Sequence, residues 1–246
     1  TISTLQLGVG SLYALFLWAA PDARSFPSIT AKDIVKLLPV AFCAAGAHAG
    51  SVFALSAGAV SFGQIVKAAE PAFAAVIGTF LYGKSISTAK WLSLIPVIGG
   101  VCLASVKELD FAWAALIAAC TANIFAAFKG NENKKLMDAK GIKDRFAGVG
   151  NQFAVTEVLA FFISVPVMMA TEGPKWGEFV ELLMTSRDLQ LGLAISGMSF
   201  YLYNELATMT IKATGAVTSS VANTAKRVIV MVYMAAVTGK ALTEEQ

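Results

Sequence analysis

The chain has 246 residues, of which 57% are hydrophobic and only 14% are charged, and its formal net charge is +3. An ordinary soluble domain is about 45–50% apolar and about 25% charged, so this composition excludes a typical soluble enzyme and predicts an integral membrane protein. The small net charge and the lack of a basic stripe with interleaved aromatic residues give no sign of a nucleic-acid partner.

Eight apolar segments approach the roughly 20 residues that a helix needs to cross a bilayer core of about 30 Å. They are residues 1–19, 33–56, 60–82, 88–106, 110–129, 147–171, 189–210 and 214–238. Several connections are only a few residues long, which predicts antiparallel hairpins. When the loops are assigned alternately to two faces, one face carries most of the Lys and Arg residues, as the positive-inside rule expects. We therefore predict an all-α polytopic membrane protein with eight spans.

Further features of the sequence lie within these spans or between them. The stretch 46–50 (Gly-Ala-His-Ala-Gly) has the small-residue spacing that lets helices approach closely in lipid. Residues 175–184 are too few to span and predict an amphipathic helix at the interface. Residues 130–146 are polar and charged and predict a loop. Prolines inside spans are expected to kink them or to free carbonyls: Pro39, Pro71, Pro96 and Pro166.

A short internal similarity suggests a repeat. Residues 58–61 (Gly-Ala-Val-Ser) precede Lys67, and residues 215–218 (Gly-Ala-Val-Thr) precede Lys226 and Arg227. Five spans separate the two segments, so they cross the membrane in opposite directions, which is the pattern of an inverted repeat of five helices.

The eight spans are then expected to belong to a ten-span protein whose first and last helices are missing here. Residues 1–129 would form spans two to six of that protein, comprising the first half without its first helix, together with a pseudo-symmetry partner helix. Residues 130–146 would be a charged loop between the halves, and residues 147–246 the second half without its last helix.

Three cations lie where hydrocarbon is expected: Lys67, Lys226 and Arg227. A charge at mid-bilayer costs roughly 2.5–3.5 kcal/mol on the insertion scale. Lys67 lies about 10 Å into its span, which is too deep for easy snorkelling. An ion pair with Glu70 at i+3 is the structural alternative.

Lys226 and Arg227 have no acid within one turn on their own helix, and adjacent cations repel strongly in a low dielectric. The planar fork of an arginine suits a phosphate or carboxylate. The alternative is pairing across helices with Glu157 or Glu205. We predict that the three cations form one anion-binding site, which a phosphate dianion would largely neutralise.

Other polar residues within spans are candidates for the same site. His48 is the only histidine, and Ser51 follows one turn later. His48 is either a hydrogen-bonded core residue or a ligand. Of Tyr201 and Tyr203, one is expected to reach a substrate and the other to face core or lipid. No metal-ligand spacing, nucleophile–base set or phosphate-binding loop occurs, so we predict no catalytic residue, metal or cofactor.

Four motifs resemble, in order, the signatures of the plastidic phosphate translocators of the drug/metabolite transporter superfamily. They are Ala-Val-Ser-Phe followed by Lys67 and Glu70-Pro71, then residues 91–97, residues 203–208 and residues 223–228. The triose-phosphate/phosphate translocators are the most similar group. Glu205 stands where many members have Gln, and residues 129–146 depart from the usual pattern.

The resemblance implies ten helices in two inverted halves in the plastid inner envelope. It implies antiport of inorganic phosphate against phosphorylated C3 sugars, such as triose phosphate and 3-phosphoglycerate, by alternating access. Lys67, Lys226 and Arg227 match the phosphate ligands of the family, and His48, Ser51 and Tyr203 match its other substrate contacts. The presence of His48 favours phosphorylated C3 sugars over phosphoenolpyruvate as the substrate. We expect the protein to be a monomer or a weak dimer.

The alternatives are a transporter of the same fold for hexose phosphates, pentose phosphates or nucleotide sugars, a membrane enzyme acting on a phosphorylated substrate, and an anion channel.

Overall fold

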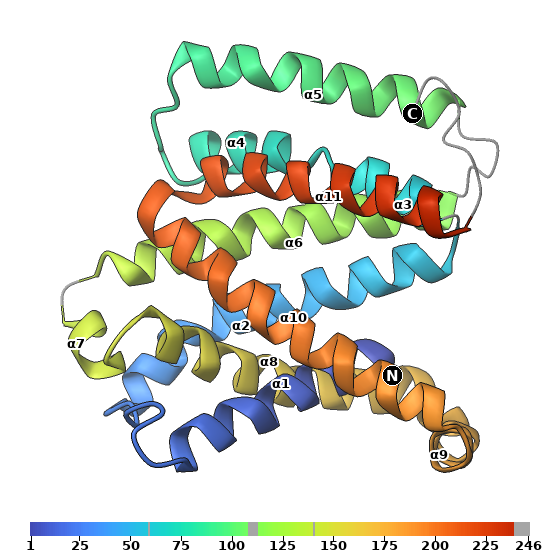
Figure 1. Ribbon diagram of the computed structural model, residues 1–246. Coiled ribbons are helices and arrows are strands. Elements are labelled where there is room, and N and C mark those ends of the chain that lie inside the picture. The colour runs from blue at the N-terminus through green and yellow to red at the C-terminus, as the bar shows by residue number, and fades with distance from the viewer. Residues whose placement is uncertain (59, 108–112, 140, 239–246) are drawn as a thin grey trace. The chain divides into compact units, whose positions relative to one another are not determined.

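A computed structural model describes residues 1–58, 60–107, 113–139 and 141–238, and within these ranges every regular element is a helix (Figure 1). The predicted all-α class is therefore confirmed. The chain divides into two compact units. Unit 1 comprises Thr1–Ala45 and Glu132–Ala213, and unit 2 comprises Gly46–Asn131 and Thr214–Gln246. These units differ from the sequential halves proposed from the sequence, and the inverted repeat stays a prediction.

Unit 1 is built around a pair of helices, α1 (Ile2–Ala19) and α8 (Val149–Glu172), which pack against each other. Small side chains at Ala41, Ala45 and Ala160 surround Leu7 in its core, which lets the helix backbones come close. The unit also contains the first part of α2 (Ala31–Ser56), the end of α6 (Trp113–Met137), α7 (Ile142–Phe146), the 3₁₀ turn η1 (Gly173–Lys175), α9 (Trp176–Thr185) and α10 (Arg187–Thr214).

Unit 2 contains the rest of α2 and α6 together with α3 (Val60–Lys67), α4 (Glu70–Phe80), α5 (Thr88–Lys107) and α11 (Ala216–Thr238). Helix α11 packs along both α3 and α4 (Figure 1). Helix α2 approaches α6 at two glycines. A Cβ on Gly50 would lie 3.2 Å from the Cβ of Ala122, and one on Gly46 would lie 2.9 Å from the ring of Phe125. The small residues of the stretch 46–50 thus allow the close approach expected of them.

The predicted span 60–82 is not one helix but two. Helix α3 ends at Lys67 and α4 begins at Glu70. Pro71 explains the break, because it has no N–H and its ring clashes with the carbonyl four residues earlier, that of Lys67. The expectation that Pro71 frees carbonyls is confirmed. Helices α2, α5 and α8 continue past Pro39, Pro96 and Pro166.

The loop predicted over 130–146 is wrong for its first part, because α6 continues to Met137 and α7 follows. Glu132, Lys134 and Lys135 are good helix formers, and the two lysines lie in the last turn, where the helix dipole favours cations. Lys212 Nζ donates to the Met137 carbonyl at 2.8 Å and to Asp138 Oδ1 at 2.9 Å. The Lys212 ammonium lowers the pKa of the Asp138 carboxyl and closes the end of the helix.

Within the part of the chain that the structure describes, four helical segments are both long and apolar enough to cross a membrane: Ile2–Ala19, Ala31–Ser56, Trp113–Met137 and Val149–Thr185. Helices α10 and α11 have sufficient length but carry more polar residues, including those of the candidate site, and α3 and α4 are short because the span is broken. The eight-span topology therefore stays a prediction.

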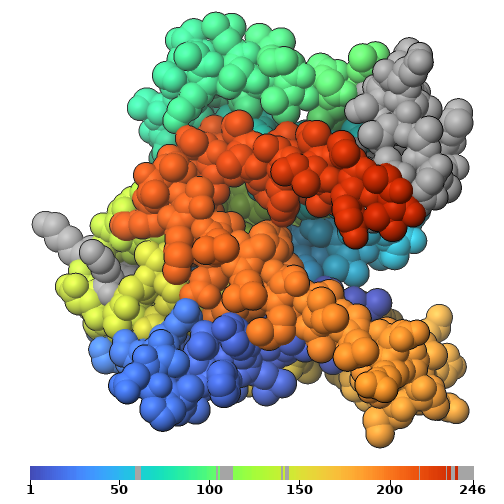
Figure 2. All heavy atoms as spheres, viewed as in Figure 1, coloured from blue at the N-terminus to red at the C-terminus, as the bar shows by residue number. Residues whose placement is uncertain are grey.

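Burial follows the pattern of a membrane protein, with polar side chains inside and large apolar side chains outside. Asn123 and Asn131 are completely buried, whereas Leu12, Phe80 and Phe162 are each more than 60% exposed. Helix α9, expected from the sequence as an amphipathic interfacial segment, has no buried residue and lies at the surface (orange in Figure 2). Polar groups in the interior and an apolar outer surface suit a lipid environment.

Candidate anion-binding site

The site in unit 2 is built on the break between α3 and α4. Lys67 is the last residue of α3 and Glu70 the first of α4. The dipoles of the two helices favour a cation at the C-terminus of one and an acid at the N-terminus of the other. The break therefore gives both charges a favourable backbone environment inside the protein, where Lys67 is only 7% exposed.

Side chains from α6 and α11 hold the backbone at this break. Thr224 Oγ1 lies 3.3 Å from the carbonyl oxygen of Ala68 and 3.2 Å from that of Ser220. Asn123 Nδ2 donates to the Val66 carbonyl at 3.0 Å, in addition to the turn bond that this oxygen accepts from Ala69 N at 3.2 Å. Unwound backbone inside a membrane protein needs such partners because water does not reach it.

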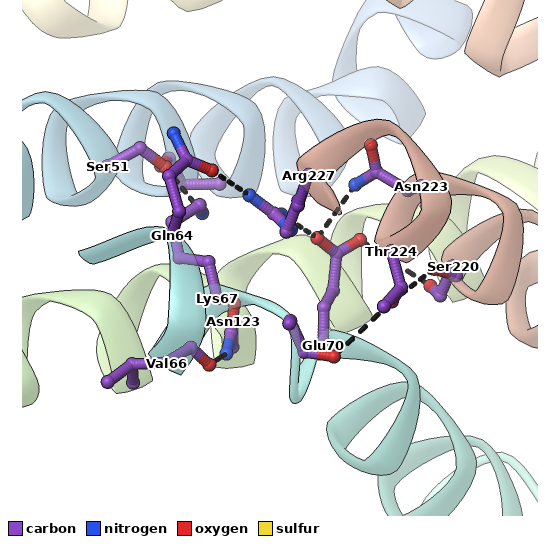
Figure 3. A network of polar contacts seen from close by, with 12 residues as sticks. Ser51, Gln64, Val66, Lys67, Glu70, Asn123, Ser220, Asn223, Thr224 and Arg227 are labelled. Atoms are coloured by element: carbon purple, nitrogen blue, oxygen red, sulfur yellow. Dashed lines mark hydrogen bonds and ion pairs between the residues drawn. The ribbon is translucent and has the colours of Figure 1, made fainter. Parts of the chain in front are cut away.

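Arg227 on α11 faces this break (Figure 3). Its Nη2 donates to Glu70 Oε2 at 2.8 Å and its Nη1 donates to Gln64 Oε1 at 3.2 Å. The Arg227 side chain is almost completely buried, and among the described residues its Nε–H has no hydrogen-bond acceptor. The Nε–H of this buried guanidinium can thus donate to an anion.

Glu70 is held mainly from α11. Its Oε2 accepts from Asn223 Nδ2 at 3.0 Å as well as from Arg227, and its Oε1 lies 3.5 Å from Ser220 Oγ. Ser220, Asn223 and Arg227 follow the i, i+3, i+7 spacing of one helix face. The carboxylate therefore has several donors and a fixed position.

Lys67 makes a different contact. Its Nζ donates to Ser51 Oγ at 2.6 Å, and Ser51 Oγ donates to the Ala47 carbonyl at 2.6 Å. The structural alternative of a Lys67–Glu70 pair within one helix is wrong, because the helix is broken between them and Glu70 pairs with Arg227. The structure thus brings together two of the predicted site residues, Lys67 and Ser51, through a neutral hydroxyl.

The remaining predicted residues of unit 2 lie near this group. His48 is buried on α2, one turn before Ser51, and Lys226 is half-buried next to Arg227 on α11. The positive charge of Lys226 repels that of Lys67. Lys226 is itself repelled by Arg227 and attracted by Glu70. The alternative of pairing across helices is confirmed for Arg227, but its ion-pair partner is Glu70 on α4, and the expected partners Glu157 and Glu205 are wrong.

Lys129 was not anticipated as part of the site. Its charge acts on four of the site's groups: His48, Lys67, Glu70 and Lys226. In the sequence it is the last residue of the predicted span 110–129. Because α6 continues past it to Met137, Lys129 is an internal helix residue and is half-buried.

Tyr203 lies in unit 1, on α10, where it is 41% exposed and packs edge-on against Phe200. Its role at the site stays a prediction. Its neighbour Tyr201 is completely buried, as expected for one of the two tyrosines, and its hydroxyl accepts from Arg24 Nη1 at 3.2 Å. Arg24 Nη2 also donates to Glu205 Oε1 at 2.5 Å, which accounts for the acid that departs from the family pattern.

Sequence reasoning also missed Gln64, Ser220 and Asn223. A signal for all three was present in the helical spacing of the polar residues: Gln64 precedes Lys67 by three positions, and Ser220 and Asn223 precede Arg227 by seven and four. Chemically, the arrangement offers cationic donors for an anion. In the described part of the chain, no group of three or more His, Cys, Asp or Glu residues could hold a metal ion.

The chain matches a known protein family over almost its whole length. Residues 1–245 match the model of the Triose-phosphate Transporter family. The chain is 33% identical to phosphoenolpyruvate/phosphate translocator 3, chloroplastic, of Oryza sativa subsp. japonica over 237 residues, covering 94% of the chain and 58% of that protein.

Two further relatives are triose phosphate/phosphate translocators, chloroplastic. The protein of Spinacia oleracea is 34% identical over 237 residues, covering 94% of the chain and 56% of the relative. The protein of Brassica oleracea var. botrytis is 32% identical over 250 residues, covering 99% and 59%. The chain thus spans less than two thirds of the length of these relatives. With a family match over nearly every residue, the chain belongs to the Triose-phosphate Transporter family.

Proposed function

We propose that the full-length protein is an antiporter that exchanges inorganic phosphate for phosphorylated C3 compounds across the plastid inner envelope. Membership of a transporter family and the names of the plastid relatives support this proposal. The observation that carries it is the buried Arg227, whose Nε–H is unused and which lies beside the broken helix that ends in Lys67. A phosphate oxygen is the natural acceptor for such a donor.

The charges of the site support a mechanism for obligatory exchange. Lys67, Lys226 and Arg227 bring three positive charges and Glu70 brings one negative charge, and Lys129 adds a further cation nearby. Burying such an excess away from water is costly. A bound phosphate neutralises most of this excess positive charge. The loaded carrier therefore switches readily between opening to one side of the membrane and opening to the other, whereas the empty carrier does not.

The organic part of the substrate is proposed to meet His48, Ser51 and Tyr203. A C3 sugar phosphate is the preferred candidate on the basis of His48. Relatives named for triose phosphate and for phosphoenolpyruvate match this chain at 32–34% and 33% identity, so both compounds belong in the test. Hexose phosphates, pentose phosphates and nucleotide sugars are the alternative substrates, and a monomer or weak dimer is the proposed assembly.

The test is uptake of labelled phosphate into liposomes that carry the full-length protein, either empty or preloaded with triose phosphate. We expect uptake only into preloaded vesicles. Lys67→Ala, Lys226→Ala and Arg227→Ala should each lower exchange at least about tenfold, because a charged hydrogen bond contributes about 1.5–3 kcal/mol. Lys32→Ala is the matched control, because Lys32 is exposed at the start of α2.

Three results would contradict the proposal. Equal uptake into empty vesicles would indicate a channel or uniporter. Transport of a nucleotide sugar without competition from phosphate would indicate the alternative substrate class. Consumption of a phosphorylated substrate by the purified protein in detergent would indicate an enzyme.

A further inference from the structure

We propose that Glu70 is a built-in counter-ion that sets the charge preference of the anion site, weakening the binding of anions with an additional carboxylate relative to those with phosphate alone. The inference rests on the proposed function and deepens it, because it assigns a specificity role to a residue outside the predicted ligand set.

Glu70 is anchored at the site by its hydrogen bonds. Its Oε2 accepts from both Arg227 Nη2 at 2.8 Å and Asn223 Nδ2 at 3.0 Å. It also occupies the first turn of α4, where the helix dipole favours a negative charge. A carboxylate with this support stays in place when a ligand arrives.

Arg227 keeps donors that Glu70 and Gln64 do not use. Glu70 accepts one N–H of Nη2 and Gln64 accepts one N–H of Nη1, while Nε–H has no acceptor among the described residues (Figure 3). A ligand anion that binds through Nε–H therefore shares one guanidinium with Glu70. Two anions on one planar cation lie close enough for strong repulsion in a buried site.

The repulsion between Glu70 and a bound anion increases with the charge of that anion. Coulomb energy is proportional to the product of the charges. Glu70 therefore destabilises a bound anion with three negative charges more than one with two. Removing the charge of Glu70 should strengthen the binding of phosphate compounds with and without a carboxylate. The gain in affinity should be larger for the phosphate esters that carry a carboxylate.

The same contacts allow a purely structural role, in which Glu70 only orients Arg227. That role predicts a different result, because misplacing Arg227 weakens every phosphate compound by a similar factor. The ratio between the two classes of substrate distinguishes the roles, whereas overall activity does not.

The experiment uses the full-length protein with Glu70→Gln, which keeps the shape and the acceptor oxygen but not the charge. Exchange is measured in phosphate-loaded liposomes at a pH of about 8, where phosphate monoesters are dianions. The KM values for two substrates are compared, triose phosphate without a carboxylate and 3-phosphoglycerate with one. We expect the KM for the carboxylated substrate, divided by that for triose phosphate, to fall about tenfold in Glu70→Gln. Glu70→Asp, which keeps the charge, should return this ratio toward that of the wild type even if exchange is slower.

Glu178→Gln is the matched control on exposed helix α9 and should leave the ratio unchanged. An unchanged ratio in Glu70→Gln, with both KM values raised alike, overturns the inference and leaves Glu70 as a positioning residue.

A binding measurement separates this outcome from failure of the proposed function. The stabilisation of the purified protein by 3-phosphoglycerate and by inorganic phosphate is measured by thermal unfolding in detergent. If Glu70→Gln increases the stabilisation by 3-phosphoglycerate more than the stabilisation by inorganic phosphate, the inference is supported even if the wild type does not exchange phosphate. A change that is equal for both ligands overturns it.

Discussion

At the scale of single residues, the interior of unit 2 depends on side chains that complete the hydrogen bonds of an interrupted backbone. Thr224 is the clearest case, because its hydroxyl reaches the Ala68 carbonyl in the gap between α3 and α4. Asn123 adds a donor to the Val66 carbonyl beside it. These residues contact the backbone of the site and thereby determine where Lys67 and Glu70 lie.

Replacing Thr224 by the isosteric Val tests this role. The Ala68 carbonyl would then be buried without its side-chain donor, and an unsatisfied buried polar group costs about 1–3 kcal/mol. We expect thermal unfolding in detergent to occur at lower temperature and exchange to be slower. Thr171→Val is the control, because Thr171 is exposed and, among the described residues, its hydroxyl bonds only backbone carbonyls of its own helix. Equal stability of the two variants would contradict the assignment.

At the scale of helices, the break between α3 and α4 positions the charges of the site. A continuous helix would place Lys67 and Glu70 one turn apart on the same face. The break instead lets Glu70 pair with Arg227 and Lys67 meet Ser51. Since Pro71 causes the break, its pyrrolidine ring determines which partners the charged groups of Lys67 and Glu70 can reach.

Pro71→Ala should therefore impair exchange without unfolding the protein. The N–H of the new alanine could donate to the Lys67 carbonyl and join α3 to α4, because the steric and hydrogen-bond obstacle, worth about 3 kcal/mol in a helix interior, would be gone. We expect exchange to fall at least about tenfold, with thermal stability equal to or above that of the wild type. Pro96→Ala in α5, which continues as a helix past its proline, should keep normal exchange. Full activity of Pro71→Ala would show that the break is not needed.

The helices could be predicted from hydropathy with errors that have local causes. The predicted spans 1–19, 33–56 and 147–171 agree closely with α1, α2 and α8, because long apolar runs have few alternatives. The continuation of α6 was missed because polarity was taken as a sign of a loop, although its residues are good helix formers.

The site was predictable in part. Its cations could be recognised because charge within an apolar run is costly. The partner of Arg227 could not be chosen, because Glu70 lies 157 residues away and two other acids were equally available in the sequence. Lys129 was missed because its helix was predicted to end at that position.

At the scale of the whole molecule, many polar side chains are buried and many large apolar side chains are exposed. Buried amides such as Asn123 and Asn131 contrast with exposed side chains such as Phe80 and Phe162. In lipid the apolar exterior has no cost, and a buried amide such as Asn131 bonds within the protein, accepting from Lys84 Nζ and donating to the Ala127 carbonyl. The stability of the fold and its membrane location thus have a common origin.

Phe162→Lys tests the outer surface. Phe162 is 64% exposed near the middle of the predicted span 147–171, where a lysine costs roughly 2.5–3.5 kcal/mol on the insertion scale. We expect less protein to resist alkaline extraction from membranes, whereas Phe162→Leu should integrate normally. Normal integration of Phe162→Lys would mean that this face of α8 does not contact lipid.

The ion pair between Glu70 and Arg227 also has a consequence for the order in which the protein is assembled. The pair joins α4 to α11, so 157 residues separate its two halves along the chain. Until α11 reaches its neighbours, the carboxylate of Glu70 and the carbonyl of Ala68 lack donors that the finished protein supplies. The site is therefore completed only after α11 has been synthesised, and a chain that stops before α11 would leave the Glu70 carboxylate inside the protein without its Arg227 partner.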